Sequence, residues 1–410
     1  MTAEPVFDPT TPLAGPPEPW DHAPTPSPRS GPPYHMTEMI AAEPAFAGRL
    51  LGRLAAVGGS ASDLAEAIRA TLAAGDPVIV TGCGTSEHGA LAAAEILREA
   101  AVEVGLVGAT VTAEQAFELS LAPPPRGLVI GVSHEGATGA TNAALRAARD
   151  AGRSTALITV SGRSPAGAFA DIVVETEELD QGWCHTVGYL SPVVAAAAVG
   201  AHLSGRPVDA EGAEALLAAG TRDEAAAERI AASLADATTL LVIASGADRP
   251  AGRELVLKVE EGAWLPSAYR DLETFLHGHL PATGRETGLV LVLTDRDRRS
   301  ERVARARQAL AAARVIGSRT AAIVSADVDR TLDPALTPAG RLVVPEAPGL
   351  PAPVAALLGT ATPLQLLTER LARARGTNPD PIRRDDPVYL AAAEAADATE
   401  ADDAHDAPAG

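Results

Sequence analysis

Lysine is almost absent from this chain of 410 residues, in which Lys258 stands alone against 32 arginines. On a solvated surface the two residues are nearly interchangeable, so the general replacement indicates no more than codon bias. A lysine that escapes the bias either survived by chance or supplies a compact ammonium that arginine cannot supply. Glu261 follows it by three residues, so on a helix both side chains would share one face.

Basic charge, aromatic residues and cysteines are also scarce. The formal net charge of -20 argues against nucleic acid or an anionic membrane surface as a partner. Aromatic residues make up 3% of a chain that is 46% hydrophobic, which predicts a core of alanine, valine, leucine and isoleucine. The two cysteines, Cys83 and Cys184, are far apart and do not suggest a disulfide framework.

Long apolar segments are missing from the sequence as well. No uninterrupted apolar run reaches the ~18 residues expected of a membrane-spanning helix. The N-terminus also lacks a basic segment followed by an apolar stretch. We therefore expect a soluble cytoplasmic protein without a membrane partner.

The length predicts two domains with tails. Residues 1–35 hold eleven of the 33 prolines and are expected to form an extended, disordered arm. Residues 389–410 consist largely of Ala, Asp and Glu and are expected to form a solvated acidic tail, helical at most at its start. The two domains are assigned to residues 36–205 and 206–388.

Short apolar segments alternate with amphipathic ones in both halves of the chain. Helices are expected at residues 36–57 and 62–74, and a helical segment at 212–235 joins the halves. Strands are expected at 77–81, 127–132, 155–160 and 172–175, and again at 239–244, 288–293, 321–325 and 342–345. This alternation predicts an α/β fold with two parallel sheets, each covered by helices on both faces.

Two strand-to-helix turns carry the first functional signal. Gly82–Ser86 follows the first strand, and Ser133–Thr138 follows the second. In an open parallel sheet, ligands bind at the carboxyl ends of the strands, where helix N-termini offer free N–H groups to anions. Either turn alone is also typical of an ordinary capped turn. The two together indicate a binding site.

These turns carry a resemblance to a known family. C-G-T-S after one strand, S-x-x-G-x-T after the next and E-x-x-x-K-x-x-E in the second half resemble the sugar isomerase (SIS) domain family. The nearest pattern is the double-SIS isomerase part of glucosamine-6-phosphate synthase and its shorter relatives, matched from about Met36 to Asp386. The resemblance implies two tandem flavodoxin-like SIS domains, a sugar or sugar-phosphate ligand and no cofactor. Because no glutaminase domain precedes the match, no glutamine hydrolysis is expected.

The resemblance also assigns roles to individual residues. Glu261 matches the carboxylate that moves a proton between C1 and C2, and Lys258 matches the lysine one turn earlier. His277 matches a ring-opening histidine that comes from a neighbouring subunit, which implies a homodimer. Further residues are expected to bind the sugar or its phosphate or to line the pocket: Thr85, Ser86, Ser133, His134, Glu135, Thr138, Trp183, His185 and Arg383.

The catalytic roles are chemically reasonable on their own. A carboxylate can take a proton from carbon and return it to the neighbouring carbon. Histidine titrates near neutral pH, and an ammonium stabilises a developing enediolate oxygen. The alternatives are a solvated helix face for Glu261 and a turn histidine bonded to backbone for His277.

Three departures from the family pattern bear on the reaction. Glu135 stands where the phosphate loop usually has a second serine, and a carboxylate ~4 Å from a phosphate charge costs about 4 kcal/mol at an effective dielectric constant of ~20. Residues 180–187 differ from the Ser-Thr-Lys of the synthase, and residues 378–386 lack its sugar-proximal lysine. Schiff-base chemistry could therefore rest only on Lys258. The sequence leaves open an aldose–ketose isomerase, an aminosugar isomerase or deaminase, and a non-catalytic sugar-binding or regulatory protein.

Several metal-ligand residue types fall on the same loops. Cys83, His134, Glu135, Cys184 and His185 could in principle hold a divalent metal, but their spacing matches no standard motif. A Cys184–His185 nucleophile is also conceivable, although adjacent residues seldom point at each other. We expect pocket-wall residues and no metal.

Overall fold

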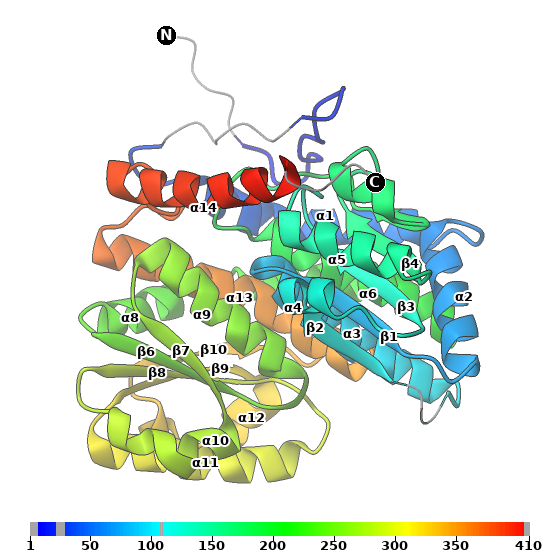
Figure 1. Ribbon diagram of the computed structural model, residues 1–410. Helices are drawn as coiled ribbons and strands as arrows, with labels where there is room; N and C mark the ends of the chain where they lie inside the picture. Colours follow the sequence, from blue (N-terminus) through cyan, green and yellow to red (C-terminus); the bar gives the residue numbers. More distant parts are fainter. Residues whose placement is uncertain (1–6, 22–28, 107, 109, 406–410) are drawn as a thin grey trace.

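Two five-stranded parallel sheets form the framework of the computed structural model, which describes residues 7–21, 29–106, 108 and 110–405 (Figure 1). Their strand orders are β2-β1-β3-β4-β5 and β10-β9-β8-β6-β7. Numbered from the first strand of each half, both orders read 2-1-3-4-5, the flavodoxin-like order. The predicted fold class, with one unit repeated, is therefore confirmed.

The first sheet and its helices alternate along the first half of the chain. The strands are β1 (Val78–Gly82), β2 (Val111–Gln115), β3 (Leu128–Val132), β4 (Ser154–Thr159) and β5 (Ile172–Glu175). The helices are α1 (His35–Leu54), α2 (Ser60–Ala73), α3 (Thr85–Glu103), α4 (Ala116–Leu121), α5 (Gly139–Asp150) and α6 (Val187–Ser204), with a 3₁₀ turn at Pro165–Phe169.

The second half repeats the pattern after two connecting helices, α7 (Ala210–Gly220) and α8 (Glu224–Leu234). Its strands are β6 (Thr239–Ala244), β7 (Ser267–Asp271), β8 (Thr287–Leu293), β9 (Arg319–Ser325) and β10 (Gly340–Val344). Its helices are α9 (Arg249–Ala263), α10 (Leu272–Thr274), α11 (Arg299–Ile316), α12 (Ala326–Thr331), α13 (Ala352–Arg375) and α14 (Pro387–His405).

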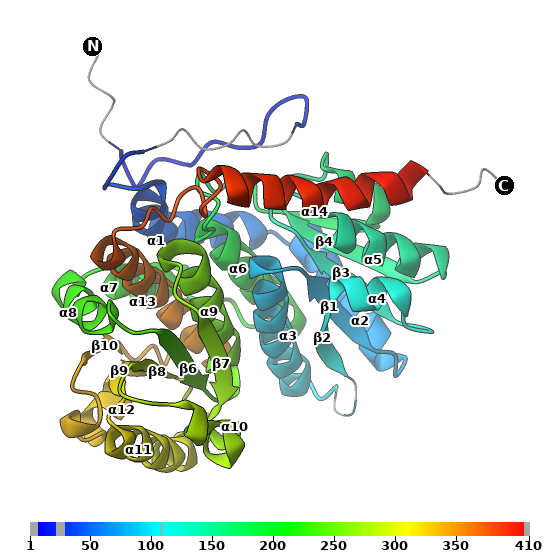
Figure 2. The same cartoon turned by 60° about the vertical axis from the view of Figure 1, so that its left-hand side comes forward.

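The inner faces of the two sheets share one hydrophobic core. This core joins β1, β3, β6 and β8 through α1, α3, α6, α9 and α13. The outer face of the first sheet packs on α4 and α5, and that of the second sheet packs on α10 and α11. Helix α3 of the first unit and helix α9 of the second lie side by side between the sheets (Figure 2). Residues of both units therefore contact each other along these two helices.

The burial of each strand explains whether it could be predicted from the sequence. Every residue of β1, β3 and β8 is buried, so these central strands are continuous apolar segments. The edge strands β2 (VTAEQ) and β7 (SAYRD) are largely half-exposed or exposed and carry polar residues, and both are missing from the sequence-based expectation. The two omissions fall at equivalent edge positions in the repeated unit.

Helix α6 is the most apolar of the long helices. Within the described part of the chain, α6 alone has the length and composition of a membrane-crossing helix, with a mean hydropathy of 1.4 over 18 residues. Ser191 and His202 interrupt α6, so it is not an uninterrupted apolar run of the kind that the sequence analysis sought. Most of α6 (83%) is buried in the protein, between α3, α2 and α1, so packing explains its apolar surface.

The N-terminal arm differs from the expected disordered segment, whereas the acidic tail was expected to be solvated with a helical start. Of the proline-rich arm, residues 7–21 pack on the first unit: the Leu13 amide donates to Glu178 Oε2 (2.8 Å), and the Leu179 amide donates to the Ala14 carbonyl (2.9 Å). Disorder is therefore the wrong expectation for this part, while residues 1–6 and 22–28 lie outside the described residues. The acidic tail begins as α14, which crosses the molecule near α1 (Figure 1).

Candidate functional site

The turn after β1 abuts α9 of the second unit. A Cβ on Gly84 would lie 3.9 Å from Leu257 Cδ2, which shows how closely the turn approaches the helix. Thr85 opens α3, and its hydroxyl donates to Glu254 Oε1 at 3.4 Å. His88, one turn later, places Nδ1 2.7 Å from Glu254 Oε2. The first sheet therefore delivers two polar side chains to one carboxylate of α9.

Lys258 lies one turn beyond Glu254 and is completely buried. Its Nζ is 2.5 Å from Glu261 Oε2 and 3.6 Å from Glu254 Oε1. The four- and three-residue spacings place both carboxylates on the face of α9 that carries the lysine, as expected from the sequence. We call Thr85, His88, Glu254, Lys258 and Glu261 the Lys258 cluster.

The charges of the cluster stabilise one another. Burial opposes the charge on Lys258, but Glu261, followed by Cys184 and Glu254, raises the pKa of the ammonium above its ordinary value. Burial alone would raise the pKa of Glu254, yet Lys258 and His88 lower it. Lys258 is therefore a permanent ammonium at neutral pH. A Schiff base, which needs a neutral amine, is not favoured at this lysine.

Glu261 is the accessible carboxylate of the cluster, with 23% of its side chain exposed, whereas Glu254 is fully buried. It opens onto a cleft of about 470 Å³ lined also by Trp264, Arg383 and Tyr389. The Arg383 guanidinium lies 4.6 Å from the Trp264 ring centre and 3.9 Å from that of Tyr389. Its Nε has no hydrogen-bond partner within the described residues. The structure therefore places a cation of the C-terminal segment in the same cleft as Glu261.

The turn after β3 forms an open set of donors. Ser133 Oγ donates to Thr138 Oγ1 at 3.4 Å, so the two predicted phosphate hydroxyls lie together. Gly136 has φ +71°, and a Cβ there would lie 2.0 Å from Ser164 Oγ, so the tight turn requires glycine. Over the part of the chain that the structure describes, no side chain accepts a hydrogen bond from the backbone N–H groups of residues 135–140. Glu135 is half-buried and has no ion-pair partner among those residues.

The loop of residues 180–186 supplies the remaining pocket-wall candidates. His134 is buried and accepts a hydrogen bond at Nε2 from the Asp180 amide (2.9 Å), and burial lowers its pKa to about 3. His134 is therefore neutral, and its ring lies 5.3 Å from that of His185. Arg384 covers the Trp183 ring at 4.6 Å. Ser86 stands in the first turn of α3, beside Thr85.

The alternatives based on cysteine and metal ligands find no support in the geometry. Among the described residues, no three His, Cys, Asp or Glu side chains converge as a metal-ligand set. Cys83 lies 3.7 Å from the Thr141 hydroxyl, whereas Cys184 Sγ lies against the Lys258 carbonyl at 4.0 Å. Burial raises the pKa of the Cys184 thiol well above its usual value, so it remains a thiol rather than a nucleophilic thiolate.

His277 is not brought to the cluster within one chain. Its side chain is 68% exposed, and Nδ1 pairs with Glu273 Oε1 at 2.9 Å. It follows β7 at the carboxyl edge of the second sheet, where α9 begins. Glu261 lies at the other end of α9, about 20 Å away along a helix rising ~1.5 Å per residue.

Two members of the cluster were not among the expected site residues. Glu254 was visible as the first position of E-x-x-x-K-x-x-E, four residues before Lys258. His88 had a weaker signal: it follows Thr85 by three residues and so shares a helix face with it. Neither spacing reveals that α3 and α9 pack together, which is the contact that makes these residues neighbours.

Comparison with known proteins gives the same architecture. No family model matches the chain. A curated relative, glutamine–fructose-6-phosphate aminotransferase [isomerizing] of Gloeobacter violaceus, is 34% identical over 131 residues, or 31% of this chain. The matched segment spans only 20% of the length of that relative.

Solved structures cover much more of the chain. The C-terminal domain of glucosamine-fructose-6-phosphate aminotransferase from Francisella tularensis has a TM-score of 0.73 at 19% identity, covering 86% of this chain and all of that one. Tagatose-6-phosphate ketose/aldose isomerase from Escherichia coli has a TM-score of 0.68 at 18% identity, covering 87% and 98%. The double-SIS fold and the resemblance to the isomerase part of the synthase are confirmed.

Proposed function

We propose that this chain is a double-SIS isomerase that moves a proton between C1 and C2 of a sugar-phosphate derivative, as an aldose–ketose isomerase or an aminosugar isomerase or deaminase. One observation carries the proposal: Glu261 is an accessible carboxylate fixed by a buried ammonium beside the turn after β1. Relatives in fold include a protein described as a putative phosphosugar isomerase from Silicibacter pomeroyi and a glucosamine-6-phosphate deaminase of Thermotoga maritima.

In the aldose-to-ketose direction, Glu261 acts as the base. It removes the proton from C2 of the open-chain sugar, and the electron pair of the C–H bond forms the C1=C2 bond of an enediolate with its negative charge on O1. The Lys258 ammonium stabilises that charge. A proton then returns from Glu261 to C1 as C2=O forms, while the hydroxyl proton passes from O2 to O1. Glu254 is a positioning residue, because it holds Lys258 and is itself held by Thr85 and His88.

A phosphate or other polar substituent would bind at the turn after β3. Its backbone N–H groups are open, and the Ser133 and Thr138 hydroxyls lie together there. A helix N-terminus favours an anion at this position. Arg383 adds a cation near Glu261 in the segment where the synthase has its lysine. Ser86, His134, Glu135, Trp183 and His185 remain proposed pocket-wall residues.

A non-catalytic sugar-binding role is the second candidate. Glu135 places a carboxylate in the turn proposed for the phosphate, and no second lysine exists in the chain. Both features suit a protein that retains the pocket but binds a different sugar derivative. One fold relative is described as a putative sugar binding protein from Salmonella typhimurium.

We also propose a cytoplasmic homodimer in which His277 serves the Lys258 cluster of the other copy. The exposure of His277 and its place at the opposite end of α9 from Glu261 support this arrangement, because a second copy could deliver a histidine that its own chain cannot. Ring opening requires an acid–base group near neutral pH, which a histidine supplies.

Substitution of Glu261 by glutamine tests the isomerase proposal. In deuterium oxide the wild type should exchange the C2 proton of an aldose 6-phosphate substrate, and Glu261→Gln should lose this exchange by at least a hundredfold because the base is gone. Binding should change little, since the amide retains the shape of the side chain. Glu301→Gln, an exposed carboxylate on α11, is the control.

Nuclear magnetic resonance follows the exchange, and calorimetry follows the binding. Wild-type exchange in Glu261→Gln would remove Glu261 as the base. Sugar-phosphate binding by the wild type without exchange for any aldose or ketose tested would favour the non-catalytic protein.

A further inference from the structure

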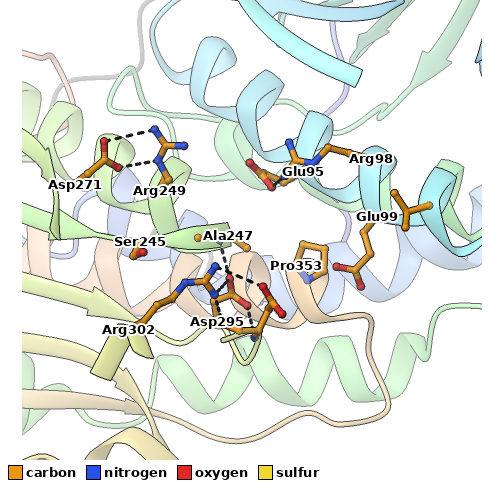
Figure 3. A pocket seen from close by; sticks show the side chains of 13 residues that line it. Glu95, Arg98, Glu99, Ser245, Ala247, Arg249, Asp271, Asp295, Arg302 and Pro353 are labelled. Atoms are coloured by element: carbon orange, nitrogen blue, oxygen red, sulfur yellow. Dashed lines mark hydrogen bonds and ion pairs between the residues drawn. The ribbon is translucent and has the colours of Figure 1, made fainter. Parts of the chain in front are cut away.

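A second cleft, of about 570 Å³, lies at the carboxyl edge of the second sheet (Figure 3). Ser245–Ala247, at the end of β6, and Asp295, after β8, line its floor. The strand order reverses between β6 and β8, and ligands of open α/β sheets bind at such switch points. The cleft therefore occupies, in the second unit, the place that the turns after β1 and β3 occupy in the first.

Two helices connect this cleft to the Lys258 cluster. Thr85, at the start of α3, belongs to the cluster. Four residues nearer the end of α3 line the second cleft: Glu95, Arg98, Glu99 and Val102. Arg249, at the start of α9, lines the second cleft, whereas Glu261, near its end, belongs to the cluster. The two antiparallel helices thus run from one cleft to the other. We call the second cleft the α3–α9 pocket.

The α3–α9 pocket is not built for phosphate. Asp248 is buried and accepts hydrogen bonds from the backbone N–H groups of Thr294 (2.6 Å) and Asp295 (2.8 Å). Asp295 in turn accepts from the Ala247 amide at 2.9 Å. In the first unit the equivalent turn keeps its donors open. In the second unit, Asp248 and Asp295 occupy the positions where an anion would bind.

The arginines of the pocket are also neutralised. Arg249 Nε pairs with Asp271 Oδ1 at 2.8 Å, Arg302 Nη1 pairs with Asp295 Oδ2 at 2.6 Å, and Arg98 pairs with Glu95. A Cβ on Gly246 would lie 2.3 Å from Asp295 Oδ2 and 2.4 Å from Arg302 Cζ, so this pair lies directly against the floor. The ion pairs present alternating donors and acceptors to the cavity, which suits hydroxyl groups.

One carboxylate of the pocket stands apart. Glu99 extends from α3 toward Pro353 and makes no ion pair with an arginine within the described residues (Figure 3). Burial raises the pKa of Glu99, although the nearby Ala352 amide opposes the rise. The full lining holds five carboxylates and three guanidiniums, which leaves an excess of negative charge. A cationic group beside Glu99 would compensate that excess.

We propose that the α3–α9 pocket is a second ligand site, for a small hydroxyl-rich molecule that carries an ammonium group and no phosphate. The paired side chains of its wall would bond the hydroxyls, and Glu99 would bind the ammonium. This inference does not rest on the proposed isomerase activity, because it concerns the other sheet and is measured by binding alone.

Calorimetry at pH 6.5 with glucosamine, glucose and glucosamine 6-phosphate tests the site. Glucosamine should bind about tenfold more tightly than glucose, a difference of about 1.4 kcal/mol. Glu99→Gln should remove this preference, since it deletes the charge but retains the shape. Glu103→Gln deletes the same charge one turn further along α3, outside the pocket, and should leave the preference unchanged. Val102→Trp should fill the mouth of the pocket and weaken the binding of both unphosphorylated sugars.

Ser133→Ala distinguishes binding at the turn after β3 from binding in the α3–α9 pocket. It alters the first site only, so it should weaken the binding of glucosamine 6-phosphate and spare that of glucosamine. Absence of glucosamine binding by the wild type would overturn the proposal. So would glucosamine binding that Ser133→Ala removes and that Glu99→Gln and Val102→Trp leave intact.

Discussion

At the scale of single residues, the geometry explains why one lysine stands in a chain of arginines. Lys258 is completely buried between two carboxylates of its own helix. A compact ammonium satisfies both at once, whereas the planar guanidinium of arginine is larger and requires a wider space. The bias toward arginine is broken at a buried position between two carboxylates.

Removal of that ammonium should destabilise the fold. Lys258→Met leaves Glu254 buried without its cation, which typically costs about 3–5 kcal/mol. The urea midpoint of unfolding at pH 7 should fall accordingly. Glu261→Gln, which leaves Lys258 paired with Glu254, should lower the midpoint much less.

The same variant should reverse the dependence of stability on pH. In the wild type, the depressed pKa of Glu254 gives a stabilisation that is present above its unfolded pKa of 4.5 and is lost as the pH falls through the folded value. Without Lys258, His88 is the remaining cluster member that opposes the effect of burial, so the pKa of Glu254 should rise and Lys258→Met should gain stability as the pH falls from 7 to 5. Melting temperatures that follow parallel pH curves in the two proteins would contradict this account.

The sequence revealed about half of the Lys258 cluster. Thr85, Lys258 and Glu261 stand in recognisable motifs, and helical spacing alone joins the last two. Thr85 and His88 contact Glu254 because α3 packs against α9. These residues are more than 160 positions apart in the sequence. No local sequence pattern indicates a contact between residues so far apart in the chain, so Glu254, the buried carboxylate at the centre of the cluster, was missed.

At the scale of elements, burial on both faces separates what was predictable from what was not. Central strands such as β1, β3 and β8 are apolar throughout, and the expected bounds agree with the observed ones to within a residue or two. The edge strands β2 and β7 have one partner each and tolerate polar side chains, so their sequences resemble loops. Helix α6 was also missed, because it is apolar all around and has no amphipathic period.

The turns after β3 and β8 differ in whether a carboxylate of the protein accepts hydrogen bonds from their backbone N–H groups. The turn after β8 is filled by Asp248, a carboxylate whose pKa burial raises to about 6. The turn after β3 keeps its donors open and carries Glu135 at its rim. In the second unit a carboxylate of the protein, Asp248, therefore occupies the turn. In the first unit Glu135 could compete with a ligand for the corresponding turn.

Substitution of Glu135 measures that competition. Glu135→Ser should strengthen the binding of sugar phosphates tenfold or more, because the carboxylate no longer repels the phosphate, and tenfold corresponds to ~1.4 kcal/mol. Calorimetry in metal-free buffer gives the affinity, and the unphosphorylated sugar is the control ligand. Tight binding of a sugar phosphate by the wild type, unchanged in Glu135→Ser, would mean that Glu135 points to solvent.

At the scale of the whole molecule, the two repeated units differ in the ligands that we propose for them. Each sheet offers a switch point, and α3 and α9 run in opposite directions between the Lys258 cluster and the α3–α9 pocket. The two units then diverge in charge: the first turn retains free donors, whereas the second is neutralised by Asp248 and Asp295. We propose that the two repeated units thereby form an anion site and a pocket for an ammonium-bearing ligand, about one helix length apart.

Assembly is the remaining requirement of the proposed reaction, because His277 and Glu261 lie at opposite ends of α9. If each site takes its histidine from the other copy, Glu261→Gln and His277→Ala should each be inactive alone. Mixed and re-associated, they should recover up to about a quarter of wild-type activity, since a heterodimer has one site that carries both defects and one that carries neither. Sedimentation must show a dimer, and Glu261→Gln mixed with itself is the control. A monomer, or no recovery after exchange of subunits is demonstrated, would place the ring-opening group elsewhere in the same chain.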